Sequence, residues 1–358
     1  MKARSLSLHD VIRKIIPADQ GWRGRARDRI LRLTMPPWAL GRLLDLAVDL
    51  AGMTRSLAPP VDRRAVVVMA GDHGVTEEGV SAFPREVTVQ MVRNFARGGA
   101  AVNVLAGAAG ARVIVVDVGV AGDLGDLAAS GKIISRRVAP GTRNFLRGPA
   151  MGREEAIRAL EVGIETAFDL ADSVDLLAAG EMGIGNTTPS SAILCAFCGI
   201  DPEAAAGRGT GLDEEGRRRK AGLIARAIEL HRPDPADPIG VLEKVGGFEI
   251  GAIAGLILGG AARRKPVLVD GFITTAGALL AQAICPAATD YMIASHRSAE
   301  PGHEAALRKI GKIPLLDLGM RLGEGTGAVL AMHLVDAAVR VLTRMATFDE
   351  AGVSGGNG

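Results

Sequence analysis

The sequence predicts an α/β protein built on a doubly wound, mostly parallel sheet with helices on both faces. Three observations carry this prediction. Short β-branched, apolar runs alternate along the chain with longer runs of helical periodicity. Glycine-bearing polar segments follow the short runs, where ligand loops of such sheets lie. The 358 residues, 48% of them hydrophobic, suit one large domain with an extensive core.

The first half of the chain is expected to contribute three strands. Residues 39–53 carry apolar side chains at helical spacing, and Pro59-Pro60 ends this polar N-terminal segment. The expected strands are residues 65–70, 112–118 and 174–179, and the expected helices between them are residues 87–96 and 154–171. Each strand is short, apolar and rich in Val or Ala, as buried parallel strands are.

The second half repeats this alternation up to a last apolar helix over residues 328–341. Helices are expected at residues 189–197, 213–231, 248–263 and 275–284, and strands at residues 267–270, 290–294 and 314–318. The carboxyl ends of parallel strands share one edge of the sheet. The loops expected to form one composite site there are residues 71–74, 117–119, 180–188, 270–271, 295–298 and 323–327.

Composition narrows the class of protein. Lys and Arg total 42 against 40 Asp and Glu, so the charge balance does not indicate a nucleic-acid partner. The three cysteines indicate a reducing compartment, and the CxxC pair Cys195 and Cys198 lies in an apolar run typical of buried thiols. The first ten residues lack a signal-peptide core, and the most apolar stretch is short and interrupted by glycines. We therefore expect a cytoplasmic protein without a membrane partner.

The segment Gly180-Glu181-Met182-Gly183-Ile184-Gly185-Asn186-Thr187-Thr188 is a candidate anion cradle. Its glycines free backbone N–H groups, and its last three side chains add hydrogen-bond donors. The same threonines could serve only as a helix N-cap. The spacing matches neither a phosphate loop of the GxxxxGK[ST] type nor a GxGxxG fingerprint, so neither ATP nor NAD is predicted.

Two more glycine-rich segments carry charge. Arg321-Leu322-Gly323-Glu324-Gly325-Thr326-Gly327 places one carboxylate among three glycines just before the last helix, which indicates either a tight surface turn or a ligand site. Gly207-Arg208-Gly209-Thr210-Gly211 precedes the helix that carries Lys220, and a glycine loop beside a cation suits a phosphate or phosphoribosyl group. An ordinary turn before a helix cap is the alternative.

In order and spacing, these motifs resemble the nicotinate-nucleotide–dimethylbenzimidazole phosphoribosyltransferase family of cobalamin synthesis. The resemblance extends from about residue 65 to residue 354 and depends on the ordered set. The further segments that carry it are Ala70-Gly71-Asp72-His73-Gly74-Val75, Glu78-Gly79-Val80-Ser81, Val87-Thr88 with Gln90-Met91, Val245-Gly246-Gly247-Phe248-Glu249-Ile250, Val269-Asp270-Gly271-Phe272, His296-Arg297-Ser298 and the C-terminal Ala351-Gly352-Val353-Ser354. The resemblance implies transfer of 5-phosphoribose from nicotinate mononucleotide to 5,6-dimethylbenzimidazole, giving α-ribazole 5′-phosphate and nicotinate with inversion.

The resemblance also implies roles for particular residues. The family's catalytic base corresponds to Glu324. The residues implied for the phosphoribosyl and nicotinate groups are Glu181, Gly183, Asn186, Gly209, Lys220, Gly271 and Ser298, and those implied for the benzimidazole are Ser81, Phe83, Gln90, Met182 and Leu322. For Phe83 and Met182 plain core packing is an equal alternative. Glu181 is either a second acid or base or a ribose-orienting group.

A lone carboxylate suits this reaction. Benzimidazole attacks through one nitrogen and must lose the proton on the other, which a carboxylate within reach can accept. The same charge stabilises the positive ring as the bond forms. Nicotinate leaves readily because its nitrogen is cationic in the nucleotide, so we expect neither a metal nor a cofactor.

The resemblance further implies a homodimer and a small helical lobe made from both chain ends. The expected division is residues 1–60 for the N-terminal part of the lobe, 61–330 for a large Rossmann-like domain, and 331–358 for the C-terminal helix and tail. One departure concerns this lobe. The family's Pro-x-Gly-Ser-Leu-Gly stretch is replaced by Pro36-Pro37-Trp38-Ala39-Leu40-Gly41, which could alter a wall of the base pocket or a subunit contact.

Two other functions are weighed against the transferase. A metal-dependent hydrolase would use Asp72, His73, Asp270 and His296, although no HxH or HExxH spacing is present. A non-catalytic protein that binds azoles or nucleotides would need the pocket but not a carboxylate within reach of the ring nitrogen. The ordered motif set favours the transferase.

Overall fold

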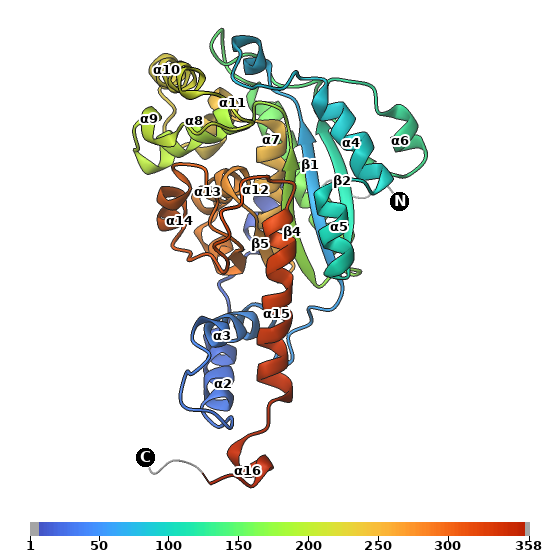
Figure 1. Cartoon of the computed structure of the whole chain (residues 1–358), viewed down its shortest axis with the longest axis vertical. Helices are drawn as coiled ribbons and strands as arrows, with labels where there is room; N and C mark the ends of the chain where they lie inside the picture. Colours follow the sequence, from blue (N-terminus) through green and yellow to red (C-terminus); the bar gives the residue numbers. More distant parts are fainter. Residues whose placement is uncertain (1–6, 355–358) are drawn as a thin grey trace.

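The computed structural model describes residues 7–354 and centres on a six-stranded, all-parallel sheet (Figure 1). The strands are β1 (Arg64–Gly71), β2 (Ala111–Gly119), β3 (Ile134–Ser135), β4 (Leu176–Met182), β5 (Val267–Val269) and β6 (Met292–Ala294). Their order is β3-β2-β1-β4-β5-β6, the arrangement of a doubly wound sheet. The predicted fold class is therefore confirmed. The order reverses between β1 and β4, which is where such sheets bind ligands.

Helices cover both faces of the sheet. Val66 of β1 faces α15 (Thr326–Arg344), because a Cβ added to Gly325 at the start of that helix would reach its side chain. Leu177 of β4 lies in register with Ala65, one residue earlier, and points the opposite way toward α12 (Phe248–Ala262). With both faces covered, the central strands are apolar throughout and almost completely buried.

The remaining helices agree closely with the periodicity of the sequence. They are α4 (Val87–Arg97), α5 (Ala101–Ala108), α6 (Gly125–Ala129), α7 (Arg153–Leu170), α8 (Thr187–Cys198), α9 (Pro202–Ala205), α10 (Glu214–His231), α11 (Pro238–Val245), α13 (Phe272–Ile284) and α14 (His303–Ile310), with 3₁₀ turns η1 (Gly74–Glu78) and η2 (Pro286–Tyr291). The predictions did not include α5, α6, α9, α11 or α14, which have only four to eight residues each and too few turns for a clear period.

Both chain ends form a small helical lobe beside the sheet domain. Figure 1 shows α15 running from the sheet into this lobe, where α2 (Gln20–Ile30) and α3 (Arg42–Thr54) pack beside it. The chain ends also meet directly, since Thr34 N–H donates to the Ala346 carbonyl at 3.1 Å and Phe348 N–H donates to the Arg32 carbonyl at 2.9 Å. The short α16 (Phe348–Ala351) follows, whereas α1 (Leu8–Ile12) packs on α7 and α12.

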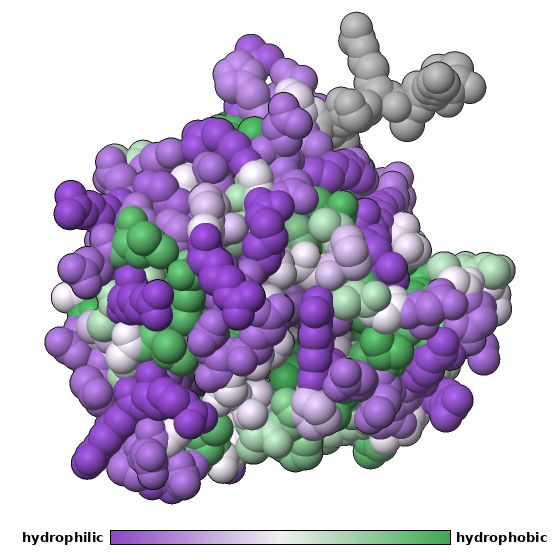
Figure 2. All heavy atoms as spheres, turned by 90° about the horizontal axis from the view of Figure 1, so that it is seen from above, coloured by the Kyte–Doolittle hydropathy of each residue, from purple (hydrophilic) through white to green (hydrophobic). Residues whose placement is uncertain are grey.

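Helix α15 is the one helix in the described part of the chain with the length and apolar composition to cross a membrane. Its apolar residues pack on α3, α5 and the sheet, and Val329, Met332 and Val335 are fully buried. The composition of α15 therefore reflects its position in the core. The face of the molecule seen in Figure 2 is mainly hydrophilic, with separate hydrophobic patches.

Two predicted boundaries are wrong. Residues 314–318 are not a strand and make only an isolated bridge between His296 and Leu316, because this segment continues as a loop along the end of the sheet. Residues 180–182 were expected in a loop but belong to β4, where Glu181 pairs in register with Met69. Glu181 is therefore held by the sheet ladder.

Candidate functional site

A cavity of about 650 Å³ lies at the carboxyl ends of β4 and β5, next to the point where the strand order reverses. Ten of the thirteen predicted site residues line it: Phe83, Glu181, Met182, Gly183, Asn186, Gly209, Gly271, Ser298, Leu322 and Glu324. They come from six separate segments of the chain. Four of the six loops expected to form one composite site contribute to the lining, those at residues 180–188, 270–271, 295–298 and 323–327. The expected loops at residues 71–74 and 117–119 lie outside it, because they follow β1 and β2 on the other side of the point where the strand order reverses.

Glu324 sits in a constrained turn just before α15. Its φ of 62° lies in the left-handed region, which costs a non-glycine residue about 1 kcal/mol or more. Gly180 permits the turn, since a Cβ there would overlap the Glu324 carbonyl. The carboxylate is 6% exposed, and its Oε2 accepts a hydrogen bond from Val102 N–H at 3.2 Å, at the start of α5.

Burial raises the pKa of the Glu324 carboxyl, the Val102 N–H lowers it, and the nearby Asp270 carboxylate raises it again. A carboxyl with a raised pKa is a stronger base when ionised. The N-terminus of α5 at the same time favours the ionised form and fixes its direction. The geometry therefore suits a carboxylate that accepts a proton from a ligand in the cavity.

Glu181 lies close to Glu324 and is equally buried, but it has different hydrogen-bond partners. Its Oε2 accepts a hydrogen bond from Asn186 Nδ2 at 2.5 Å, and its Oε1 accepts a weaker one from Glu324 N–H at 3.4 Å. Burial raises the pKa of Glu181 to about 8, and the charges of Asp270 and Glu249 add to the shift. Two neighbouring carboxyls in different environments can take different roles.

The opposite end of the cavity contains cationic and hydrogen-bond-donating groups that suit an anion. Lys220 is fully buried, and its Nζ donates to Thr187 Oγ1 at 2.6 Å and to the Gly207 carbonyl at 3.3 Å. Burial lowers the pKa of Lys220 to about 8. Lys220 does not line the cavity itself but lies behind Thr187 and Gly209, which do. Ser298 and the N-terminus of α8 lie at the same end.

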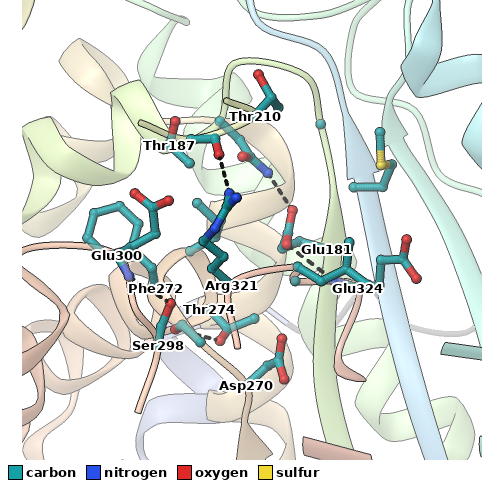
Figure 3. Close-up of a pocket in the computed structure, with 18 of the residues that line it drawn as sticks. Glu181, Thr187, Thr210, Asp270, Phe272, Thr274, Ser298, Glu300, Arg321 and Glu324 are labelled. Atoms are coloured by element: carbon teal, nitrogen blue, oxygen red, sulfur yellow. Dashed lines mark hydrogen bonds between the residues drawn. The ribbon is translucent and has the colours of Figure 1, made fainter. Parts of the chain in front are cut away.

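Two residues that the predictions omitted, Arg321 and Glu300, join this end, together with Thr187 of the predicted anion cradle. Arg321 lines the mouth, and its Nη1 donates to the Gly209 carbonyl at 3.1 Å. Glu300 and Thr187 lie with Ser298 on one side of the view in Figure 3, and Glu324 lies on the other with Glu181 between them. Burial raises the pKa of Glu300. Arg321 belonged to the quoted glycine motif, so its charge was a usable signal, whereas the sequence around Glu300 contained none.

The cavity also has an apolar part to its lining. Phe83, Met182 and Leu322 belong to it, together with Val87 and Met91 on one face of α4. Gln90 lies on a neighbouring face of α4, is exposed and is not part of the lining. Ser81 is also outside the lining, but its Oγ lies 2.9 Å from Thr210 Oγ1 and accepts from Phe83 N–H. Ser81 thus supports the wall without reaching the cavity.

The four residues of the hydrolase alternative do not form one cluster. His296 Nε2 is 3.7 Å from Asp270 Oδ1, whereas His73 Nε2 is 2.8 Å from Glu249 Oε1 and Asp72 Oδ2 accepts from Ala121 N–H at 2.8 Å. Within residues 7–354, no group of three or more His, Cys, Asp and Glu side chains is placed to hold a metal ion. The geometry therefore offers this alternative no metal centre.

Two further features of the sequence lie away from the cavity. Cys195 is buried and Cys198 partly buried, and burial raises the pKa of both thiols, that of Cys195 to about 12, so neither is a reactive thiolate. Trp38 adopts a φ of 55° at the position where the family has glycine, and its Nε1 donates to Asp45 at 2.9 Å. Neither Trp38 nor Ala39 lines the cavity.

Comparisons with known proteins reveal similar sequences along almost the whole chain. A family model described as phosphoribosyltransferase matches residues 15–353. Two curated relatives are named nicotinate-nucleotide–dimethylbenzimidazole phosphoribosyltransferase. The protein from Syntrophotalea carbinolica is 61% identical over 349 residues, 98% of this chain and 99% of the relative. That from Geobacter sulfurreducens is 54% identical over 351 residues, 98% and 99% of the two chains.

Solved structures show the same likeness. The crystal structure of CobT from Thermus thermophilus has a TM-score of 0.89 and 52% identity, covering 94% of this chain and all of the other. A second structure from that organism, of nicotinate-nucleotide–dimethylbenzimidazole phosphoribosyltransferase, has a TM-score of 0.88 and 51% identity and covers 94% of this chain.

Proposed function

The chain belongs to the nicotinate-nucleotide–dimethylbenzimidazole phosphoribosyltransferase family, and on this premise we propose how its cavity carries out the reaction. The enzyme transfers 5-phosphoribose from nicotinate mononucleotide to 5,6-dimethylbenzimidazole, producing α-ribazole 5′-phosphate and nicotinate. The observation that supports two subsites is the mixed polarity of the cavity. Lys220 and Arg321 donate to Thr187 and Gly209, and Thr187 lies with Ser298 across Glu181 from Glu324, whereas Phe83, Val87, Met91, Met182 and Leu322 make the rest of the lining apolar (Figure 3).

We assign the polar end to the 5-phosphoribosyl group. The ammonium of Lys220, held behind Thr187 and Gly209, supplies charge, and the backbone N–H groups of the glycine loops supply directed donors. Asn186, Gly183, Gly271 and Ser298 complete this subsite. The anomeric carbon then lies near the middle of the cavity, beside Glu181.

We assign the apolar end to the dimethylbenzimidazole. Phe83, Met182 and Leu322 form walls for a flat methylated ring, with Val87 and Met91 beside them. Ser81 and Gln90, which are not in the lining, act on this subsite through the loop and helix that carry them. Phe83 and Leu322 are about half exposed at the mouth and close over the ring.

In the reaction, the unprotonated ring nitrogen of the benzimidazole attacks the anomeric carbon. The bond from that carbon to the nicotinate nitrogen breaks, and its electron pair neutralises the pyridinium. Glu324 takes the proton from the second benzimidazole nitrogen, and it stabilises the positive ring before that transfer. Glu181, next to the anomeric carbon, orients the ribose hydroxyls and supplies negative charge to the oxocarbenium-like centre when ionised.

The test is a nicotinate-release assay with both substrates, applied to Glu324→Gln. The variant keeps the size of the side chain but cannot accept the proton, so kcat should fall about 100-fold or more. Glu304→Gln, an exposed change on α14, is the control and should keep normal turnover. Near-normal kcat in Glu324→Gln would contradict the base role, and release of no nicotinate by the parent enzyme would contradict the transferase itself.

We further propose that the protein is a cytoplasmic homodimer with the small lobe formed by residues 331–358 and most of residues 1–60. Helix α1 packs on α7 and α12 and so lies outside this lobe. Support comes from exposed apolar residues around and beyond the mouth, since Leu318 is 63% and Ile313 is 68% exposed. Arg42 of the lobe donates to the Ile313 carbonyl at 2.7 Å, so this apolar rim is continuous with the lobe. The lobe boundary at residue 330 falls inside α15, which makes that helix the rigid link.

A further inference from the structure

Asp270 connects the end of β5 to the turn that carries Glu324. We propose that Asp270 is a positioning residue, which holds the Glu324 carboxylate at the reacting end of the cavity by capping α15 from a different strand. The inference rests on the proposed role of Glu324 as base. The inference also gives a function to Asp270 and His296, two of the residues that the hydrolase alternative would use.

The capping geometry is specific. Asp270 is 2% exposed; its Oδ1 accepts from Ala328 N–H at 2.8 Å and its Oδ2 from Gly325 N–H at 3.2 Å. The first N–H groups of a helix have no partner within the helix. Gly325, the N-cap residue of α15, has no side chain to bind them. Asp270 therefore takes the place of the missing cap and ties the helix start to the sheet.

His296 closes the other side of the same turn. Its Nε2 lies 3.7 Å from Asp270 Oδ1, and a Cβ at Gly327 would overlap the imidazole ring. The first turn of α15 therefore fits only with glycine at position 327. Glu324, two residues before this turn, has its own N–H directed at Glu181 Oε1. Its left-handed backbone is thus held by contacts from β4, β5 and the loop after β6.

Titratable and hydrogen-bonding groups from each neighbouring element surround this turn. Glu181 approaches from β4, His296 from the loop after β6, Glu249 from α12 through its effect on Glu181, and the Val102 N–H from α5. The negative charge of Asp270 raises the pKa of Glu324. Replacing that charge by a neutral group should consequently lower the pKa of Glu324 and also loosen its position.

The experiment compares Asp270→Asn and Asp270→Ser with the control Asp117→Asn in the full chain. Asp117 is also a buried carboxyl at the end of a parallel strand, where it accepts from Val120 N–H at 2.9 Å, but it does not line the cavity. Thermal melting of each variant is recorded first. The serine variant keeps a hydroxyl that can cap a helix, so it serves if the asparagine variant does not fold.

The expected result is a fall in kcat of roughly 10- to 100-fold, with KM for both substrates within about threefold of the parent value. The acid limb of the kcat–pH profile should move to lower pH, because Glu324 ionises more easily without the neighbouring charge. Asp117→Asn should change neither kcat nor the acid limb. A purely structural role would lower stability without moving the acid limb.

Unchanged kcat and an unchanged acid limb in a folded Asp270 variant would overturn the inference. So would a loss of activity that Asp117→Asn reproduces at the same melting temperature. Glu324→Gln in the same assay separates this failure from that of the proposed function. If Glu324→Gln is active, the base assignment fails; if it is inactive and Asp270→Asn is normal, only the positioning role fails.

Discussion

At the scale of single residues, the cavity combines acids and a lysine whose pKa values are shifted by burial. Glu181 and Lys220 both have a pKa of about 8, from opposite directions. Each group is held by hydrogen bonds to neutral partners, Asn186 and Thr187 respectively. Such groups change charge near neutral pH, so the affinity of this site for a charged substrate should depend on pH.

Lys220 leads to a prediction about substrate affinity. Because burial lowers its pKa to about 8, its ammonium loses a proton above that pH and can no longer attract the phosphate. KM for nicotinate mononucleotide should rise about fivefold between pH 8 and pH 9. Initial-rate measurements over pH 7 to 9.5 check this.

The control is Lys220→Gln, whose neutral side chain cannot titrate. Its KM should be high at all pH values and lack the rise above pH 8. If the variant shows the same rise as the parent enzyme, the rise belongs to another group and the assignment of Lys220 to the phosphate subsite fails.

At the scale of elements, the long helices α7 and α12 lie in close contact. A Cβ at Gly163 would overlap the Ala252 carbonyl, and one at Gly255 would overlap the Leu160 carbonyl. The two helices therefore contact each other through their backbones. Helix α12 also packs on β1, β2 and β4, so this contact helps fix the face of the sheet opposite α15.

Gly163→Ala should destabilise the protein by about 3 kcal/mol or more, since neither backbone can move without disturbing the sheet. The matched control is Gly222→Ala on the exposed face of α10, where an added Cβ meets nothing within 4 Å. That variant should be neutral or stabilised by up to about 1 kcal/mol. Urea unfolding measures both, and equal stability of the two variants would contradict the close packing.

At the scale of the whole molecule, acids with raised pKa values gather on one edge of the sheet. Glu181, Asp270, Glu300 and Glu324 all lie around the cavity, and burial is the largest cause of each shift. Burying carboxyls without direct cationic partners weakens the folded state whenever they ionise. We expect this loss of stability in a site whose carboxylates must stabilise a positive reaction centre.

This arrangement predicts how stability changes with pH. A carboxyl whose pKa is raised by folding contributes stability that is complete at low pH and is lost as pH rises to the folded pKa. For Glu181 this window runs from its ordinary value of 4.5 to about 8. The melting temperature should therefore fall between pH 5 and pH 8, and Glu181→Gln should show a smaller fall.

Lys220 does not contribute to the change in stability between pH 5 and pH 8. Its pKa is lowered by burial, so it affects stability only between about pH 8 and its ordinary pKa of 10.5. The other raised acids remain in the Glu181→Gln variant, so its melting temperature should still decrease slightly with pH. Identical pH dependence in the two proteins, measured by calorimetry, would show that Glu181 does not carry the shifted pKa.

Much of the fold and part of the site were predictable from the sequence by itself. The strands and long helices could be located because apolar periodicity is local, and the glycine loops marked the carboxyl edge of the sheet. Glu324 stood out because a carboxylate between glycines at a helix start is chemically unusual. Ten predicted residues meet in one cavity because parallel topology brings these loops together.

Only the tertiary structure decided how these residues act on one another. The sequence contains no sign that Asp270 caps α15, that Val102 N–H binds Glu324, or that Lys220 lies behind Thr187. These contacts join residues between 33 and 222 positions apart, and they depend on the strand order and on the distance between packed backbones. Local patterns determine which elements form, whereas hydrogen bonds and burial across elements determine the charge and direction of each functional group.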